Sequence, residues 1–214
     1  MLYILEHTDQ LNEDFLSRAM PLLTAQRTEQ INRYRSFSDK INGSAAFLLL
    51  CTALREEFGI LTPPCFRYRE RGKPYLDDRE DIFFNLSHCK NAAACIVSES
   101  NTAVDIMDIR NIKNNIVHRV CSDSELEKLN CSDHFDRDFI RLWTKKECYS
   151  KLDGRGLALD FRTLTDDLPE IKKIQQYETQ NYIVSYCCTA PINIIIKQPN
   201  ELFDILSPEK KNNE

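Results

Sequence analysis

The stretch AVDIMDIR at 103–110 places a carboxylate inside an otherwise apolar run, which is typical of a buried strand. If the chain is extended there, Asp105 and Met107 lie on one face and Ile106 on the other. An unpaired carboxylate is costly to bury, so Asp105 needs a cation, a backbone donor or a metal ion as its partner. That partner has to come from another part of the chain.

A second carboxylate, Glu147, lies in a predicted helix at 134–153. Helical spacing places Trp143 and Lys146 on the same face as Glu147, with Lys151 one turn beyond. On an ordinary amphipathic helix the Glu147–Lys151 pair would be exposed and would contribute little to stability. The tryptophan, however, is expected to face the core, and charged residues that share its stripe indicate a functional site.

These two carboxylates would repel each other if they met, unless a cation joined them. A hard divalent ion with oxygen ligands, Mg²⁺ or alternatively Mn²⁺, meets this need, and the neighbouring lysines favour a phosphate-bearing substrate. Met107 is a poor ligand for such an ion because its thioether is soft, so water or a main-chain carbonyl would take its place. The sequence therefore predicts a metal site at Asp105 and Glu147.

A third motif, FNLSHCK at 84–90, ends a predicted strand with Ser87 and His88. A hydroxyl and an imidazole at a strand end can donate to phosphate oxygens. Without other motifs, such a pair is more often a strand terminus with a hydrogen-bonded histidine. Ser87 is not interpreted as a nucleophile because no GxSxG turn surrounds it, and the glycine-rich phosphate-binding signatures are absent from the sequence.

Composition and charge exclude several classes of protein. The 214 residues carry a net charge of −5 without a long basic run, which argues against nucleic-acid binding. The longest apolar stretches, such as 45–54, are about half as long as a membrane-spanning helix, and the N-terminus has no signal-peptide features. The nine cysteines follow no disulfide or zinc spacing, so we expect reduced thiols in a cytoplasmic protein with no membrane contact.

The order of predicted elements indicates an α+β fold of two similar subdomains, each a small antiparallel sheet with packed helices. Helices followed by strands occur twice, and no low-complexity linker separates the halves. We expect an N-terminal subdomain at 1–101, a C-terminal subdomain at 102–206 and a polar tail at 207–214. A helical region is predicted around 13–34, and helices at 38–59, 111–121, 123–130 and 134–153. The strand at 101–109 ends the first run of elements, and the strands of the second run are predicted at 161–167, 171–178, 181–188 and 192–197.

Four linked motifs resemble the Sfp-type 4′-phosphopantetheinyl transferases: GKPYL (72–76), FNLSH (84–88), VDIMDI (104–109) and LWTKKECYSKLDGRGL (142–157). The resemblance covers about 25–190 and implies a monomer of two pseudo-twofold-related halves, with coenzyme A and Mg²⁺ in the cleft between them. It also implies the reaction. Such an enzyme moves the 4′-phosphopantetheine arm of coenzyme A to a serine of an apo acyl or peptidyl carrier protein and releases 3′,5′-ADP.

The resemblance also implies roles for individual residues. Asp105 and Glu147 would be metal ligands, and Met107 stands where many members have another acidic ligand. Residues that would contact coenzyme A are Arg27, Lys73, Pro74, Ser87, His88, Lys146 and Lys151. Residues that would act in catalysis are Glu147, Lys151 and Glu125, with either glutamate as the general base. Gln30 and Asn42 fall near positions that are often basic, which predicts a loosely held 3′-phosphate.

The carrier protein would contact the segment IKNNIVHRV at 112–120, where Ile112, Ile116 and Val120 form one helical stripe. Packing of this stripe against the protein's own core explains the pattern equally well. Two other functions compete with transfer. A non-catalytic relative would bind coenzyme A or a carrier without reaction, and a Mg²⁺-dependent phosphohydrolase would release product without a carrier.

Overall fold

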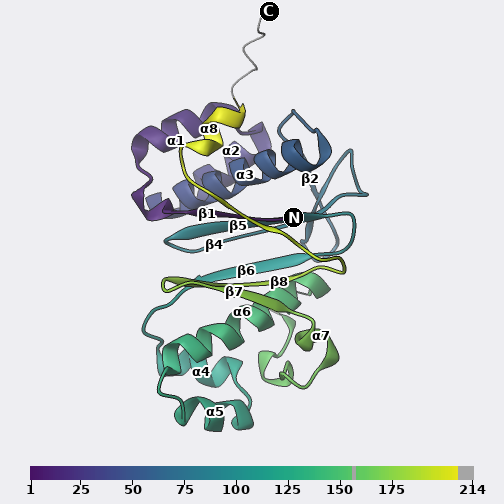
Figure 1. Ribbon diagram of the computed structural model, residues 1–214. Helices are drawn as coiled ribbons and strands as arrows, with labels where there is room; N and C mark the ends of the chain where they lie inside the picture. Colours follow the sequence, from purple (N-terminus) through teal and green to yellow (C-terminus); the bar gives the residue numbers. More distant parts are fainter. Residues whose placement is uncertain (156–157, 207–214) are drawn as a thin grey trace, which may run out of the picture.

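The computed structural model describes residues 1–155 and 158–206, which form four layers in the order helices, sheet, sheet, helices (Figure 1). The predicted α+β class, with small sheets and packed helices, is confirmed. The polar tail predicted at 207–214 lies outside the described residues. In the described part of the chain, no helix combines the length and apolar character needed to cross a membrane.

The N-terminal subdomain packs a long helix on a sheet with the strand order β4-β5-β1-β9, in which β9 is Ile194–Lys197. Its helix α3 is buried along most of its length, begins after the Ser36 cap and ends at Gly59, whose φ of 66° suits a residue without a side chain. The elements are β1 (Leu2–Glu6), α1 (Glu13–Ala19), α2 (Ala25–Arg33), α3 (Phe37–Phe58), β2 (Phe66–Tyr68), β3 (Pro74–Leu76), β4 (Phe83–His88) and β5 (Ala92–Ser98), with short 3-10 turns at Thr8–Gln10 and Met20–Leu22.

The C-terminal subdomain packs helix α6 on a three-stranded sheet with the order β6-β8-β7. The elements are β6 (Ala103–Asp108), α4 (Asn114–Val120), α5 (Asp123–Asn130), α6 (Phe135–Asp153), α7 (Pro169–Lys172), β7 (Gln175–Glu178) and β8 (Tyr182–Cys187). The strand predicted at 161–167 is wrong: Phe161–Thr163 form a 3-10 helix, because the Asp160 side chain caps this turn by accepting the backbone N–H of Arg162. The strand predicted at 171–178 begins only at Gln175, after the short helix α7.

The two sheets pack face to face, and this contact explains why β5 is apolar on both faces. Ala92, Ala94 and Ile96 point toward the other sheet, where they meet Val104 and Val184. The alternate residues of β5 point toward α3 and join the N-terminal core. Strands buried on both faces read as continuous apolar runs, as 92–97 does.

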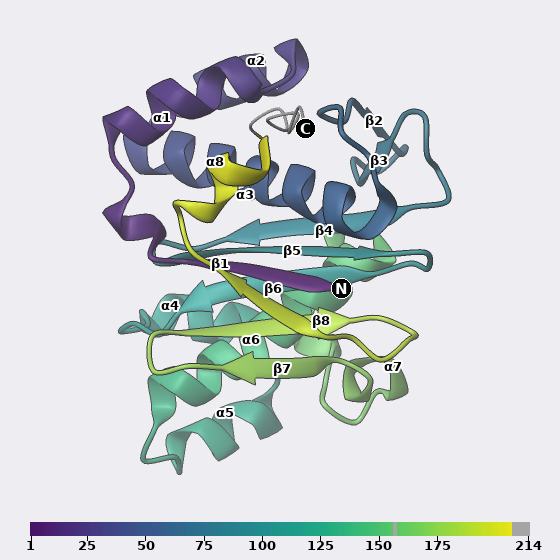
Figure 2. The ribbon, with the colours of Figure 1, turned by 45° about the horizontal axis from the view of Figure 1, so that its top comes forward.

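The last described segment returns to the N-terminal subdomain, which differs from the predicted boundary at 206. Strand β9 (Ile194–Lys197) pairs in parallel with β1, and α8 (Glu201–Leu206) follows it. Leu202 is fully buried in the N-terminal core, and the Phe203 ring lies 5.4 Å from that of Phe15. Figure 2 shows this yellow segment crossing from the end of β8 to the helical layer above β1.

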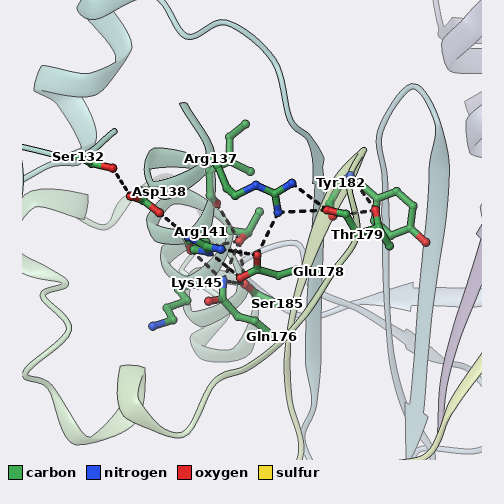
Figure 3. Close-up of polar contacts among 12 residues, drawn as sticks. Ser132, Arg137, Asp138, Arg141, Lys145, Gln176, Glu178, Thr179, Tyr182 and Ser185 are labelled. Atoms are coloured by element: carbon green, nitrogen blue, oxygen red, sulfur yellow. Dashed lines mark hydrogen bonds and ion pairs between the residues drawn. The ribbon is translucent and has the colours of Figure 1, made fainter. Parts of the chain in front are cut away.

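A polar cluster fixes α6 against the β7–β8 hairpin on the side away from the N-terminal subdomain (Figure 3). Arg141 holds Glu178 in a two-point contact, with Nε–Oε1 at 2.6 Å and Nη2–Oε2 at 2.7 Å. Below it, the Gln176 amide donates to Ser185 Oγ at 2.9 Å, and Ser185 donates to Thr144 Oγ1 at 2.8 Å. These bonds set the position of α6, which carries Glu147 and Lys151.

Candidate functional site

A cleft of about 440 Å³ opens where the two subdomains meet. Both subdomains contribute to its walls: the start of α3, the end of β4, strand β6 and one face of α6. Its lining residues include Ser38, Asp39, Asn42, Ser87, His88, Lys90, Asp105, Met107, Arg110, Trp143 and Glu147. The sequence-predicted residues Ser87, His88, Asp105, Met107 and Glu147 are therefore brought together here from two subdomains.

Asp105 finds its partners on β4 and α6. Its Oδ1 accepts hydrogen bonds from Ser87 Oγ at 2.9 Å and from Lys151 Nζ at 2.7 Å. Among the described residues, nothing donates a hydrogen bond to its Oδ2. The carboxylate is thus anchored by one oxygen from β4 and α6, and the second oxygen remains available to a ligand.

Glu147 lines the same cleft without a hydrogen bond or ion pair to any described residue. Burial and the charge of Asp105 raise the pKa of Glu147, while Lys151 partly offsets this rise. A carboxylate that is costly to ionise in this way gains from a cation. Since Asp105 and Glu147 both offer unpartnered oxygens, this donor set fits a hard divalent ion. Within the described residues no three acidic, histidine or cysteine side chains are grouped closely enough to hold a metal, so water or ligand oxygens would have to complete its shell.

Lys73 and Pro74 border a neighbouring hollow of about 190 Å³, together with Lys151, Asn85 and Ser150. Lys73 Nζ donates to Asn101 Oδ1 at 2.7 Å and, more weakly, to the carbonyl of Leu152 at 3.3 Å. Burial lowers the pKa of Lys73, and it also lowers the pKa of His88, which favours a neutral imidazole at pH 7. Of the predicted contact residues, Ser87 and His88 therefore line the cleft, and Lys73, Pro74 and Lys151 line the second hollow.

Lys146 lies outside the cleft, which differs from the predicted phosphate contact. Its Nζ is fully buried and donates to the carbonyl of Val120 at 2.8 Å, to Glu125 Oε2 at 2.7 Å and to the carbonyl of Phe161 at 2.9 Å. Adjacent helix positions differ by about 100° in direction, so Lys146 turns into the C-terminal core while Glu147 faces the cleft. With three acceptors and no exposed surface, Lys146 has no donor left for a phosphate.

Glu125 shares this buried location, so the structure does not support its predicted catalytic role. Its Oε2 also accepts the backbone N–H of Ser122 at 2.8 Å, as half of the capping box that starts α5. It is 6% exposed and borders a hollow that the cleft residues do not share. Of the two glutamates named as candidate bases, only Glu147 lines the cleft.

Arg27 also lies away from the cleft. Its guanidinium donates to the carbonyl of Gly43 at 2.6 Å and to Gln30 Oε1 at 2.8 Å, which joins α2 to α3. The residue is 8% exposed and its Nε has no partner among the described residues, so the 3′-phosphate contact of Arg27 stays a prediction.

The stripe predicted to meet a carrier protein is divided. Val120 is buried in the C-terminal core, whereas Ile112 and Ile116 are half-buried and pack against its surface. For Val120, therefore, the alternative of packing against the protein's own core is confirmed. Ile112 and Ile116 keep partly exposed surface.

Sequence reasoning missed Asn85, one of the polar residues at the subdomain contact. Its Oδ1 accepts the backbone N–H of Val104 in β6 at 3.1 Å. The available signal was the spacing in FNLSH, since Asn85 and Ser87 lie two residues apart and therefore on one face of a strand. Asp39 and Arg110 at the cleft had no comparable signal in the sequence.

Comparison with known proteins points in one direction. Residues 102–194 match the family model described as the 4′-phosphopantetheinyl transferase superfamily. A 4′-phosphopantetheinyl transferase of Bacillus subtilis is 30% identical over 147 residues, which cover 66% of this chain and 65% of the relative. The transferase ffp of the same species is 25% identical over 184 residues, 82% of each chain. The transferase Sfp of Bacillus subtilis strain 168 is 25% identical over 152 residues, 70% of this chain and 68% of the relative. The chain thus spans slightly less than two thirds of the first of these relatives.

Proposed function

We propose that this protein transfers the 4′-phosphopantetheine arm of coenzyme A to a serine of an apo acyl or peptidyl carrier protein. The chain belongs to the 4′-phosphopantetheinyl transferase superfamily and is of the Sfp type. The observation that carries this proposal is the pair Asp105 and Glu147, which line one cleft between the subdomains with unpartnered carboxylate oxygens.

Asp105 and Glu147 would hold Mg²⁺, or Mn²⁺ in its place. The ion would neutralise charge on the diphosphate of coenzyme A. Met107 lines the same cleft and contributes no hard ligand there, so this site has fewer protein oxygens than a site with three carboxylates.

In the reaction we propose, the carrier serine oxygen forms a bond to the β-phosphorus of coenzyme A, and the bond from that phosphorus to the oxygen of 3′,5′-ADP breaks. Glu147 would take the serine proton, directly or through water. Lys151 lines the second hollow with its ammonium 2.7 Å from Asp105, and we propose that it stabilises charge on the departing ADP.

The same geometry suggests a weak hold on the 3′-phosphate. Arg27 is bonded to Gly43 and Gln30, and the cleft wall at α3 offers Asp39 and Asn42 in place of basic groups. We expect 3′-dephospho-coenzyme A to be used with a KM within about tenfold of that for coenzyme A, since one exposed ion pair is worth at most about 1 kcal/mol. A hundredfold difference would contradict this expectation.

The decisive experiment incubates the protein with coenzyme A, Mg²⁺ and a panel of apo carrier proteins and measures carrier mass. A mass increment equal to one 4′-phosphopantetheine, with 3′,5′-ADP released, is the expected result. Coenzyme binding without any increment across the panel would favour the non-catalytic alternative. ADP release without a carrier would favour a phosphohydrolase. The monomeric state, the cytoplasmic location and a carrier contact at Ile112 and Ile116 stay predictions.

A further inference from the structure

The open edge of β6 is satisfied by side chains in place of a neighbouring strand. Strand β6 pairs with β8 on one side, and among the described strands none forms a ladder with its other edge. An edge with unpaired buried N–H groups is costly. On that edge the backbone N–H of Val104 donates to Asn85 Oδ1 at 3.1 Å, and that of Ile106 donates to Ser87 Oγ at 3.3 Å.

These two bonds flank Asp105 in the chain. Asn85 and Ser87 are two residues apart on β4, and their partners Val104 and Ile106 are two residues apart on β6. The two bonds therefore hold the strands in a fixed register across the subdomain contact. We call this set of contacts, from Asn85 and Ser87 to β6, the β4–β6 seam. The edge carbonyl of Val104 accepts from Lys151 Nζ at 3.1 Å, which adds α6 to the seam.

The Ser87 hydroxyl is already fully committed as a donor. It has one hydrogen, which goes to Asp105 Oδ1 at 2.9 Å, while a lone pair accepts from Ile106 N. Donation to a phosphate would require this hydroxyl to leave Asp105. Since Lys151 also donates to Oδ1, the bonds from Ser87 and Lys151 fix the carboxylate and leave Oδ2 for a ligand.

We propose that Ser87 is a positioning residue that orients Asp105 for a divalent cation, with Asn85 fixing the register of β6, rather than a contact to the coenzyme phosphate. This inference rests on the proposed function for its metal. Partners that orient a ligand commonly change metal affinity by about 10- to 100-fold when removed. A phosphate contact would instead change coenzyme affinity in the absence of metal.

The test makes two measurements on the purified full chain. Electron paramagnetic resonance measures Mn²⁺ binding, and calorimetry in EDTA measures coenzyme A binding in the absence of metal. Ser87→Ala should raise the Kd for Mn²⁺ about tenfold or more and leave coenzyme affinity in EDTA unchanged. Ser87→Thr keeps the hydroxyl and should recover Mn²⁺ affinity. Asn85→Ala should weaken Mn²⁺ binding less than Ser87→Ala does. The matched control is Ser98→Ala, because Ser98 lies on β5 beside Ser100 and Cys188, outside the cleft lining, and should change neither constant.

An unchanged Mn²⁺ Kd in Ser87→Ala, or a loss confined to coenzyme affinity in EDTA, would overturn the inference. If Ser87→Ala does not fold, hydrogen exchange of the unmodified protein decides: the Val104 and Ile106 amides should be protected, and rapid exchange at both would refute the seam. Metal binding is measured without turnover. Failure of the proposed function would therefore appear as absence of transfer by the wild type, and failure of this inference as wild-type Mn²⁺ affinity in Ser87→Ala.

Discussion

Two lysines of helix α6 each pair with a carboxylate from another element, Lys146 with Glu125 of α5 and Lys151 with Asp105 of β6. The distance from the lysine nitrogen to the carboxylate oxygen is 2.7 Å in both pairs, but their surroundings differ. Lys146 and Glu125 are enclosed, with side-chain exposures of 0% and 8%, whereas Lys151 and Asp105 have exposures of 26% and 10% at the edge of the cleft. In the enclosed pair the lysine has all three of its hydrogens bonded to oxygens. Each carboxylate keeps one oxygen without a donor among the described residues, but Glu125 Oε1 is buried in the protein, whereas Asp105 lines the cleft.

The difference between the pairs shows that the chemistry of a residue does not assign its role. A buried ion pair whose lysine gives all three hydrogens to protein oxygens joins elements of a core, and here it connects α4, α5 and the turn at Phe161 to α6. A pair that leaves one oxygen free at a cleft can take part in binding. Four predictions separate these roles.

Lys146→Met should have the largest effect, on stability. Removing the cation leaves Glu125 buried and unpaired, which should lower the free energy of unfolding by about 3–5 kcal/mol in urea denaturation. The adjacent Lys145 forms an exposed pair with Asp166, so Lys145→Met should cost at most about 1 kcal/mol. A Lys146→Met protein of normal stability that loses coenzyme affinity would assign Lys146 to the cleft after all.

Asp105→Ala should have the next largest effect, on activity. Loss of a charged group in the transfer site should lower kcat by about 10²–10³-fold while circular dichroism and cooperative unfolding are retained. Asp81→Ala removes an aspartate from an exposed pair with Arg79 and should leave kcat unchanged. An unfolded Asp105→Ala protein would show that Asp105 is chiefly structural.

The pH dependence of metal binding and of stability should report the ionisation of Glu147. Because the pKa of Glu147 is raised, protons compete with Mn²⁺ at pH values above the ordinary range of a glutamate, so metal affinity should fall as the pH falls through the folded-state pKa. Without metal, the stability that this raised pKa provides is present below the unfolded-state pKa and is lost as the pH rises through the folded-state pKa. In the metal-free protein, Asp105→Asn removes the neighbouring charge and should move the pH profile of stability to lower pH. An unmoved profile would assign it to another group.

Met107→Glu should have the smallest effect. A carboxylate at this cleft position should tighten Mg²⁺ binding by up to about tenfold, because a hard ion prefers oxygen to a thioether. Met107→Gln serves as the uncharged control of similar size. Identical Mg²⁺ titrations for both variants and the wild type would show that position 107 does not face the ion.

The sequence could predict the elements that have strong local signals. The α+β class, the long helices and the buried strand with an anchored Asp105 all follow from periodicity and from the cost of burying a charge. Asp105 does find a cation, namely Lys151. Periodicity could not decide which edge of the Trp143–Lys146–Glu147 stripe faces the cleft, because that depends on how α6 rests on β6 and β8. The protein partners of Lys146 come from three separate segments that no spacing rule connects.

Local capping and long-range pairing explain the other differences. The apolar and polar alternation at 161–167 suggested a strand, but the Asp160 side chain favours a turn there, and Pro169 then begins a helix. The pairing of β9 with β1 joins the two ends of the chain, and a single sequence contains no local signal for it. The resemblance implies a ligand contact for Arg27, whereas in the structure its guanidinium donates to the carbonyl of Gly43 on the neighbouring helix α3.

The return of 194–206 to the first sheet limits how this molecule can be divided. A scission in the connection at 99–102 would give a first fragment that lacks β9, its fourth strand, together with Leu202, a residue of its interior. A split version would therefore have to fuse 194–206 to the first fragment, or rely on both pieces to fold together. Evolution by simple fusion or exchange of either half meets the same obstacle.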